Sequence, residues 1–123
     1  KPTAKLVKRL RALNVAVPII GFPRGSGAQF GRYAHESGVT AVGVDYQTPA
    51  QFARDQAPSG MPLQGNLDPQ LLVAGGALLE QGVREVLAAF KGGPHIFNLG
   101  HGITPDATPE NLAQLVRFVK GAA

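Results

Sequence analysis

The 123-residue sequence contains no cysteine, and this absence excludes several kinds of site. Without thiols the chain has no disulfide framework, no thiolate ligand for a metal and no cysteine nucleophile. No apolar run approaches the roughly 20 residues that a membrane helix needs, and no signal-peptide hydrophobic segment is present. We therefore expect a soluble, cytoplasmic protein. The start at Lys1 rather than at a methionine indicates a processed or truncated chain.

Basic charge is concentrated at one end of the chain. The formal net charge is +4, but after the first eleven positions seven basic residues face eight acidic ones. Leu6, Leu10 and Leu13 recur at helical spacing among these early basic residues, with Val7 beside them, so the segment predicts an amphipathic helix with a solvated basic side. The charge distribution therefore favours neither nucleic acid nor a membrane as a partner. The five early basic residues are Lys1, Lys5, Lys8, Arg9 and Arg11.

Short apolar runs alternate with helical patterns along the rest of the chain, which has the length of one domain. Strands are expected at 15–22, 39–44, 62–67 and 95–99, each followed by a helix. Their starts are about 23 to 33 residues apart, which fits βα units joined by right-handed crossovers in a parallel sheet. A leading helix and four such units are compatible with a small open sheet or with half of an eight-stranded barrel.

Prolines and glycines mark the expected ends of these elements. Thr48, Asp68 and Thr108 each precede a proline, which predicts a helix N-cap followed by proline at the first helical position. The longest helical pattern contains three glycines and is expected to break near Gly75. Gly65 interrupts the third strand, which indicates a close backbone approach at that point.

In parallel α/β folds, ligands bind at the loops that follow the strands. Polar residues occupy all four of these loops, at 23–27, 45–48, 66–69 and 100–102. The first loop is rich in glycine, but Phe30 stands where the third glycine of a dinucleotide-binding fingerprint is required. The pattern therefore argues against nucleotide binding.

Two loop residues have chemistry suited to a site. Arg24 can bind a substrate carboxylate with both arms of its guanidinium, or be a surface arginine paired with a neighbour. His101, between two glycines, can exchange a proton near neutral pH, or be a turn histidine bonded to backbone. The role of Asp45 at a strand end stays open. No nucleophile elbow is present, and the spacing of His35, His95 and His101 predicts no metal site.

With these loops identified, the sequence resembles the C-terminal half of the uroporphyrinogen decarboxylase family, in its bacterial form. The resemblance covers essentially the whole chain. It implies that residues 1–123 are a single partial domain, comprising about strands five to eight of a (β/α)8 TIM barrel. The matching segments, in the order of the family, are VPIIGFPRGSG, AVGVDYQTP, PLQGNLDP and HIFNLGHGITPDATPENL.

The resemblance also implies an activity. Members of this family are carboxy-lyases that decarboxylate the four acetate side chains of uroporphyrinogen III to give coproporphyrinogen III in porphyrin and heme biosynthesis. They act as cytoplasmic homodimers without a cofactor or metal. His101 falls on the active-site histidine of the family, which implies a catalytic and substrate-binding role. Arg24 matches the basic position of its PRG loop, which implies a substrate-binding role.

Part of the family's site has no counterpart in this sequence. The arginine-rich N-terminal segment, the central aspartate, and the active-site tyrosine and serine all precede the matching segments. We therefore expect the N-terminal half of the barrel as a partner, and no activity from this chain alone. Two alternatives stay open: a corrinoid-linked methyltransferase, which the absence of cysteine argues against, and a non-catalytic remnant that binds porphyrin-like ligands.

Overall fold

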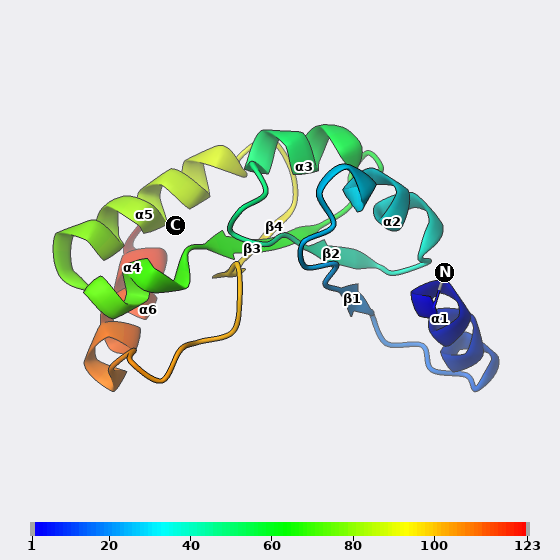
Figure 1. The fold of residues 1–123 in the computed structure, drawn as a ribbon, viewed down its shortest axis with the longest axis horizontal. Coiled ribbons are helices and arrows are strands. Elements are labelled where there is room, and N and C mark those ends of the chain that lie inside the picture. Colours follow the sequence, from blue (N-terminus) through cyan, green and yellow to red (C-terminus); the bar gives the residue numbers. More distant parts are fainter. Residues whose placement is uncertain (1, 123) are drawn as a thin grey trace.

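The computed structural model describes residues 2–122 and contains one sheet of four parallel strands alternating with helices (Figure 1). The strands are β1 (Ile20–Gly21), β2 (Ala41–Gly43), β3 (Leu63–Leu67) and β4 (His95–Leu99). The helices are α1 (Pro2–Ala12), the 3-10 turn η1 (Gly27–Gln29), α2 (Phe30–Glu36), α3 (Ala50–Gln56), α4 (Pro69–Ala74), α5 (Gly76–Ala89) and α6 (Pro109–Ala122). The expected α/β class with a parallel sheet is confirmed.

The strands lie side by side in chain order, β1-β2-β3-β4. The longest pairing joins β3 to β4, with Leu63 opposite His95 and Leu67 opposite Leu99. Because every pairing is parallel, all four strands end at the same edge of the sheet. Within residues 2–122, β1 and β4 each pair on one side only, so the sheet is open at both edges.

The first strand is much shorter than the predicted run of 15–22. Arg11 of α1 donates hydrogen bonds to the carbonyls of Val15, at 2.6 Å, and Val17, at 2.8 Å. Pro18 has no amide hydrogen to offer a neighbouring strand. Regular pairing therefore begins only at Ile20, beside Ala41 of β2.

Two of the three predicted helix caps are present. Asp68 accepts a 2.9 Å hydrogen bond from the Gln70 amide, and Thr108 accepts one of 3.2 Å from the Asn111 amide. The prediction for Thr48 was wrong, because its hydroxyl donates to a neighbouring aspartate and Pro49 occupies the cap position of α3. The helical pattern after β3 does break at Gly75, between α4 and α5.

Helices α2, α3 and α5 lie along one face of the sheet, and α1 and α6 lie at its two ends (Figure 1). Two clusters of buried side chains fill the covered face, one around Val42, Leu63 and Phe90 and the other around Leu72 and Leu79. Side chains on a strand alternate between faces. Ile96, between the half-buried His95 and Phe97, is 43% exposed, so the opposite face of the sheet is open to solvent at β4, whereas β2 is buried on both faces.

Helix α1 packs through Val7, which the predicted apolar pattern placed beside the three leucines. Val7 is buried and lies against Gly38, whereas Leu6 and Leu13 are 59% and 68% exposed. Leu10 is partly buried, and Leu13 follows the last residue of the helix. Among residues 2–122, no helix combines the length and the apolar character needed to cross a membrane.

Candidate functional site

Asp45 lies two residues after the end of β2 and is only 6% exposed. One of its carboxylate oxygens accepts a 2.8 Å hydrogen bond from the amide of Gly25, in the loop after β1. The other oxygen accepts hydrogen bonds from the Gln47 amide, at 3.0 Å, and from the Thr48 hydroxyl, at 2.9 Å. A single carboxylate therefore fixes its own turn and also holds the loop that carries Arg24.

The pKa of Asp45 is lowered from its ordinary value of 3.8. Burial is the largest single influence and raises the pKa, but hydrogen bonds from Gly25, Thr48 and Gln47 together outweigh it. Asp45 is therefore a carboxylate at neutral pH, and it acts only as an acceptor. The sequence left its role open, and the structure makes it the organiser of two loops.

Asn66, near the end of β3, connects the third loop to the second. Its side-chain amide donates to the carbonyls of Asp45, at 3.0 Å, and Thr48, at 2.8 Å. The preceding residue, Gly65, has φ +142°, and a Cβ there would lie 2.5 Å from the Val44 carbonyl oxygen. The close backbone approach predicted at Gly65 is confirmed. The contacts of Asn66 were not predicted, since no motif separates it from other polar loop residues.

Gly100 connects the loop after β4 to the loops after β2 and β3. Its amide donates to the Leu67 carbonyl at 2.7 Å, and its carbonyl accepts from the Tyr46 amide at 3.2 Å. A Cβ at Gly100 would collide with the backbone of Tyr46, so only glycine fits without movement. The next residue is His101, whose position therefore depends on these contacts.

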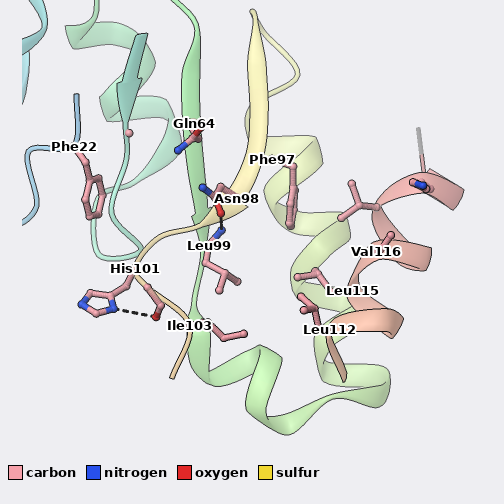
Figure 2. Close-up of a pocket in the computed structure, with 14 residues that line it drawn as sticks. Phe22, Gln64, Phe97, Asn98, Leu99, His101, Ile103, Leu112, Leu115 and Val116 are labelled. Carbon is pink, nitrogen blue, oxygen red and sulfur yellow. Dashed lines mark hydrogen bonds between the residues drawn. The ribbon is translucent and has the colours of Figure 1, made fainter. Parts of the chain in front are cut away.

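A cavity of about 660 Å³ lies between the last strand, its loop and α6 (Figure 2). Most of its wall is apolar, which suits a ligand with a large hydrophobic surface. The polar side chains that line it are Gln64, Asn98, His101 and Lys120. The apolar side chains include Phe22, Phe97, Ile103, Leu112, Leu115, Val116 and Val119.

His101 is half-buried and lines this cavity at its loop end. Its Nδ1 lies 3.1 Å from the carbonyl oxygen of Gly102, and the ring points away from α6 (Figure 2). The contact with backbone in its own turn agrees with one of the two sequence interpretations, whereas proton exchange with a ligand stays a prediction. Its Nε2 is on the far side of the ring from this contact.

Arg24 is exposed and lies in the loop after β1. Within residues 2–122, no hydrogen bond or ion pair engages its guanidinium, so its charge is open to an anion. Arg24 is outside the lining of the 660 Å³ cavity, although its loop and the loop of His101 follow strands that end at the same edge of the sheet. The structure thus places the two predicted site residues at one end of the fold but not in one cavity.

His95 has structural surroundings, and His35 is exposed on α2. His95 stacks on Phe90 with ring centroids 4.3 Å apart, and its Nε2 lies 2.6 Å from the Gly65 carbonyl oxygen. Burial lowers the pKa of His95 from 6.5, an effect that the Gly65 contact opposes and the nearby Arg54 charge reinforces. In the part of the chain that the structure describes, no three His, Cys, Asp or Glu side chains converge in a way that could hold a metal ion.

Comparison with known proteins identifies relatives of this chain. The sequence profile described as Uroporphyrinogen decarboxylase (URO-D) matches residues 1–122. Uroporphyrinogen decarboxylases from Sphingopyxis alaskensis, Hyphomonas neptunium and Mesorhizobium japonicum are 48%, 47% and 47% identical to it. These matches cover 98% or 99% of this chain but only 35% of each relative, less than the half that the resemblance implied. The chain belongs to the uroporphyrinogen decarboxylase family.

Proposed function

We propose that this chain is the C-terminal part of a uroporphyrinogen decarboxylase. The whole enzyme is a carboxy-lyase that removes the carboxyl groups of the four acetate side chains of uroporphyrinogen III and releases coproporphyrinogen III. The observation that carries the proposal is the family match over residues 1–122. The meeting of four polar loops at one sheet edge supports it, because barrel enzymes bind their substrates at that edge.

We assign substrate binding to His101 and Arg24. A tetrapyrrole is broad and largely apolar in its rings, and the cavity beside His101 has walls of matching character. The imidazole can donate a hydrogen bond or a proton to the bound substrate. Arg24 has an open guanidinium whose planar geometry suits a carboxylate of the same polyanion. Neither role requires a cofactor or metal.

The chain forms a single partial domain that is completed by the preceding part of a (β/α)8 barrel. The open edges of β1 and β4 and the exposed Ile96 support this proposal. In a closed barrel, inward-facing side chains are covered and no strand edge is left unpaired. We expect the completed enzyme to be a cytoplasmic homodimer, and we expect this chain alone to be inactive because it lacks the other substrate-binding groups of the family.

A chimera tests the proposed activity. The matched residues of this chain replace the equivalent segment of the Sphingopyxis alaskensis relative, to which they are 48% identical. The expected result is conversion of uroporphyrinogen to coproporphyrinogen, measured by chromatography of the oxidised porphyrins. A folded chimera without turnover would contradict the proposal.

The isolated 123-residue chain is the matched comparison for the partial-domain proposal. It should show no turnover under the conditions in which the chimera is active. Turnover at a rate comparable to that of the full-length relative would overturn the assignment of a partial domain. Saturable binding of a coproporphyrinogen analogue by the isolated chain, together with an inactive chimera, would instead favour a binding remnant, for which the 660 Å³ cavity is the site.

A further inference from the structure

The turn at 45–48 contacts the loops after all three other strands. It is joined to the first loop through Gly25, to the third through Asn66 and to the fourth through Gly100. Asp45 makes the first of these contacts with its side chain, whereas the other two involve backbone atoms of the turn. The contact with the first loop is therefore the one that depends on the identity of a side chain in this turn.

The loop that carries Arg24 has few other attachments. Its Ser26 amide donates to the Pro23 carbonyl at 3.2 Å, which closes a local turn. Within residues 2–122, the bond from the Gly25 amide to Asp45 is the hydrogen bond that ties segment 23–27 to another loop. Gly25 and Gly27 have φ +67° and +48°, which glycine adopts readily. The same two glycines would give the loop more conformational freedom if it were untethered. The shape of the loop therefore depends on the carboxylate of Asp45.

We propose that Asp45 is a positioning residue for the substrate, because its carboxylate holds the backbone next to Arg24 and so aims the guanidinium at a substrate carboxylate. This inference rests on the proposed function, in which Arg24 binds the polyanionic tetrapyrrole. Asp45 touches the neighbouring amide and leaves the guanidinium open, so it orders the loop without neutralising the binding charge. A loop ordered before binding has less freedom to lose when the substrate arrives.

The chemistry of the contact favours a carboxylate over an amide at this position. The Gly25 amide binds one oxygen of Asp45, while the Gln47 amide binds the other. In asparagine one of the two oxygens is replaced by an NH2 group, which donates; with the remaining oxygen kept on the Gln47 amide and the Thr48 hydroxyl, the Gly25 amide faces a donor. The lowered pKa of Asp45 agrees with this, because the hydrogen bonds stabilise the charged form more than burial destabilises it. Asp45→Asn is thus a change of one atom that leaves the Gly25 amide without an acceptor, while the contacts within the turn are kept.

The experiment uses the full-length chimera and two measurements. With Asp45→Asn, we expect the KM for uroporphyrinogen to rise about tenfold while kcat changes by less than about threefold, as for a lost binding interaction. Amide hydrogen exchange of segment 23–27 should become faster, because its tether is lost. In the Arg24→Gln background, Asp45→Asn should raise KM no further, since the two residues act through one contact.

Asp68→Ala is the matched control. Asp68 also accepts an amide hydrogen bond at the start of a helix after a neighbouring strand, but its partner is Gln70 and not the first loop. We expect this variant to lose about as much thermal stability as Asp45→Asn, with KM and the exchange of 23–27 unchanged. A KM increase of similar size in Asp68→Ala would reduce the effect of Asp45 to general destabilisation and overturn the inference.

Two further outcomes would also overturn it. The first is an unchanged KM in Asp45→Asn, and the second is an equal KM increase with and without Arg24. An inactive unsubstituted chimera counts against the proposed function instead, and the exchange measurement then decides the inference. Faster exchange at 23–27 in Asp45→Asn but not in Asp68→Ala supports the positioning of Arg24 by Asp45, and unchanged exchange contradicts it.

Discussion

The amide of Tyr46 donates a 3.2 Å hydrogen bond to the carbonyl of Gly100, and this contact joins the loop after β2 to the loop that carries His101. The two backbones approach so closely that a Cβ on Gly100 would collide with Tyr46. The position of the candidate histidine therefore depends on a glycine that carries no chemistry itself.

Gly100→Ala should destabilise the protein and displace His101. Because the added methyl group meets backbone rather than a flexible side chain, we expect the free energy of unfolding to fall by about 2 kcal/mol. Urea denaturation of the chimera measures this change. Gly102→Ala is the matched control, because a Cβ there meets no atom within 4 Å. Equal stabilities for the two variants would contradict the close approach at Gly100.

Adjacent leucines of α5 offer a matched test of the core. Leu79 is fully buried, whereas Leu78 is 59% exposed. Leu79→Ala should lower the free energy of unfolding by about 3 kcal/mol, because it removes buried apolar surface and leaves a cavity. Leu78→Ala should change it by less than about 0.5 kcal/mol. Denaturation of the two chimera variants checks both values. A larger loss of stability in Leu78→Ala than in Leu79→Ala would contradict the orientation of α5 described above.

The sequence predicted elements best where local signals act alone. β4 was predicted at its observed limits, 95–99, because Pro94 and Gly100 flank a short run that contains Ile96, Phe97 and Leu99. The first strand was overestimated because Arg11, from another element, takes carbonyl groups that the strand pattern assigns to pairing. The cap at Thr48 failed because Asp45, three residues earlier in the same turn, takes its hydroxyl. The contact of Arg11, by contrast, comes from another element and leaves no local signal in the strand.

The candidate site shows the same division. Its motifs identified Arg24 and His101 as residues with suitable chemistry, and strand order predicted that their loops share an edge. The role of Asp45 depends on a hydrogen bond to Gly25, twenty residues earlier, and Asn66 acts through carbonyls about as far away in sequence. Such contacts follow from the packing of complete loops and not from residue spacing.

Stability should depend on pH through His95. Burial is the main cause that lowers the pKa of this ring from 6.5, so the unfolded chain binds a proton more readily than the folded one. The contribution is therefore fully present above pH 6.5 and is lost as the pH falls from 6.5 toward the lowered pKa of the folded state. Thermal denaturation of the chimera between pH 5 and pH 8 measures this dependence.

His95→Gln should weaken this dependence, because glutamine does not titrate while its side-chain amide can still donate to the Gly65 carbonyl. His35→Gln, on the exposed surface of α2, is the matched control and should leave the pH profile as it is in the unsubstituted chimera. If the His95 variant kept the full loss of stability below pH 6.5, another group would be its source.

His101→Asn should reduce decarboxylation in the chimera. Asparagine retains polarity but loses the imidazole ring at the loop end of the cavity, where His101 is half-buried. Loss of one hydrogen bond to a charged substrate group should lower kcat/KM by about tenfold. Steady-state kinetics with uroporphyrinogen measure the change, and thermal denaturation verifies that the variant remains folded. His35→Asn should leave kcat/KM unchanged, because this side chain lies on α2, outside the cavity lining. An unchanged kcat/KM in His101→Asn would remove this residue from the substrate site.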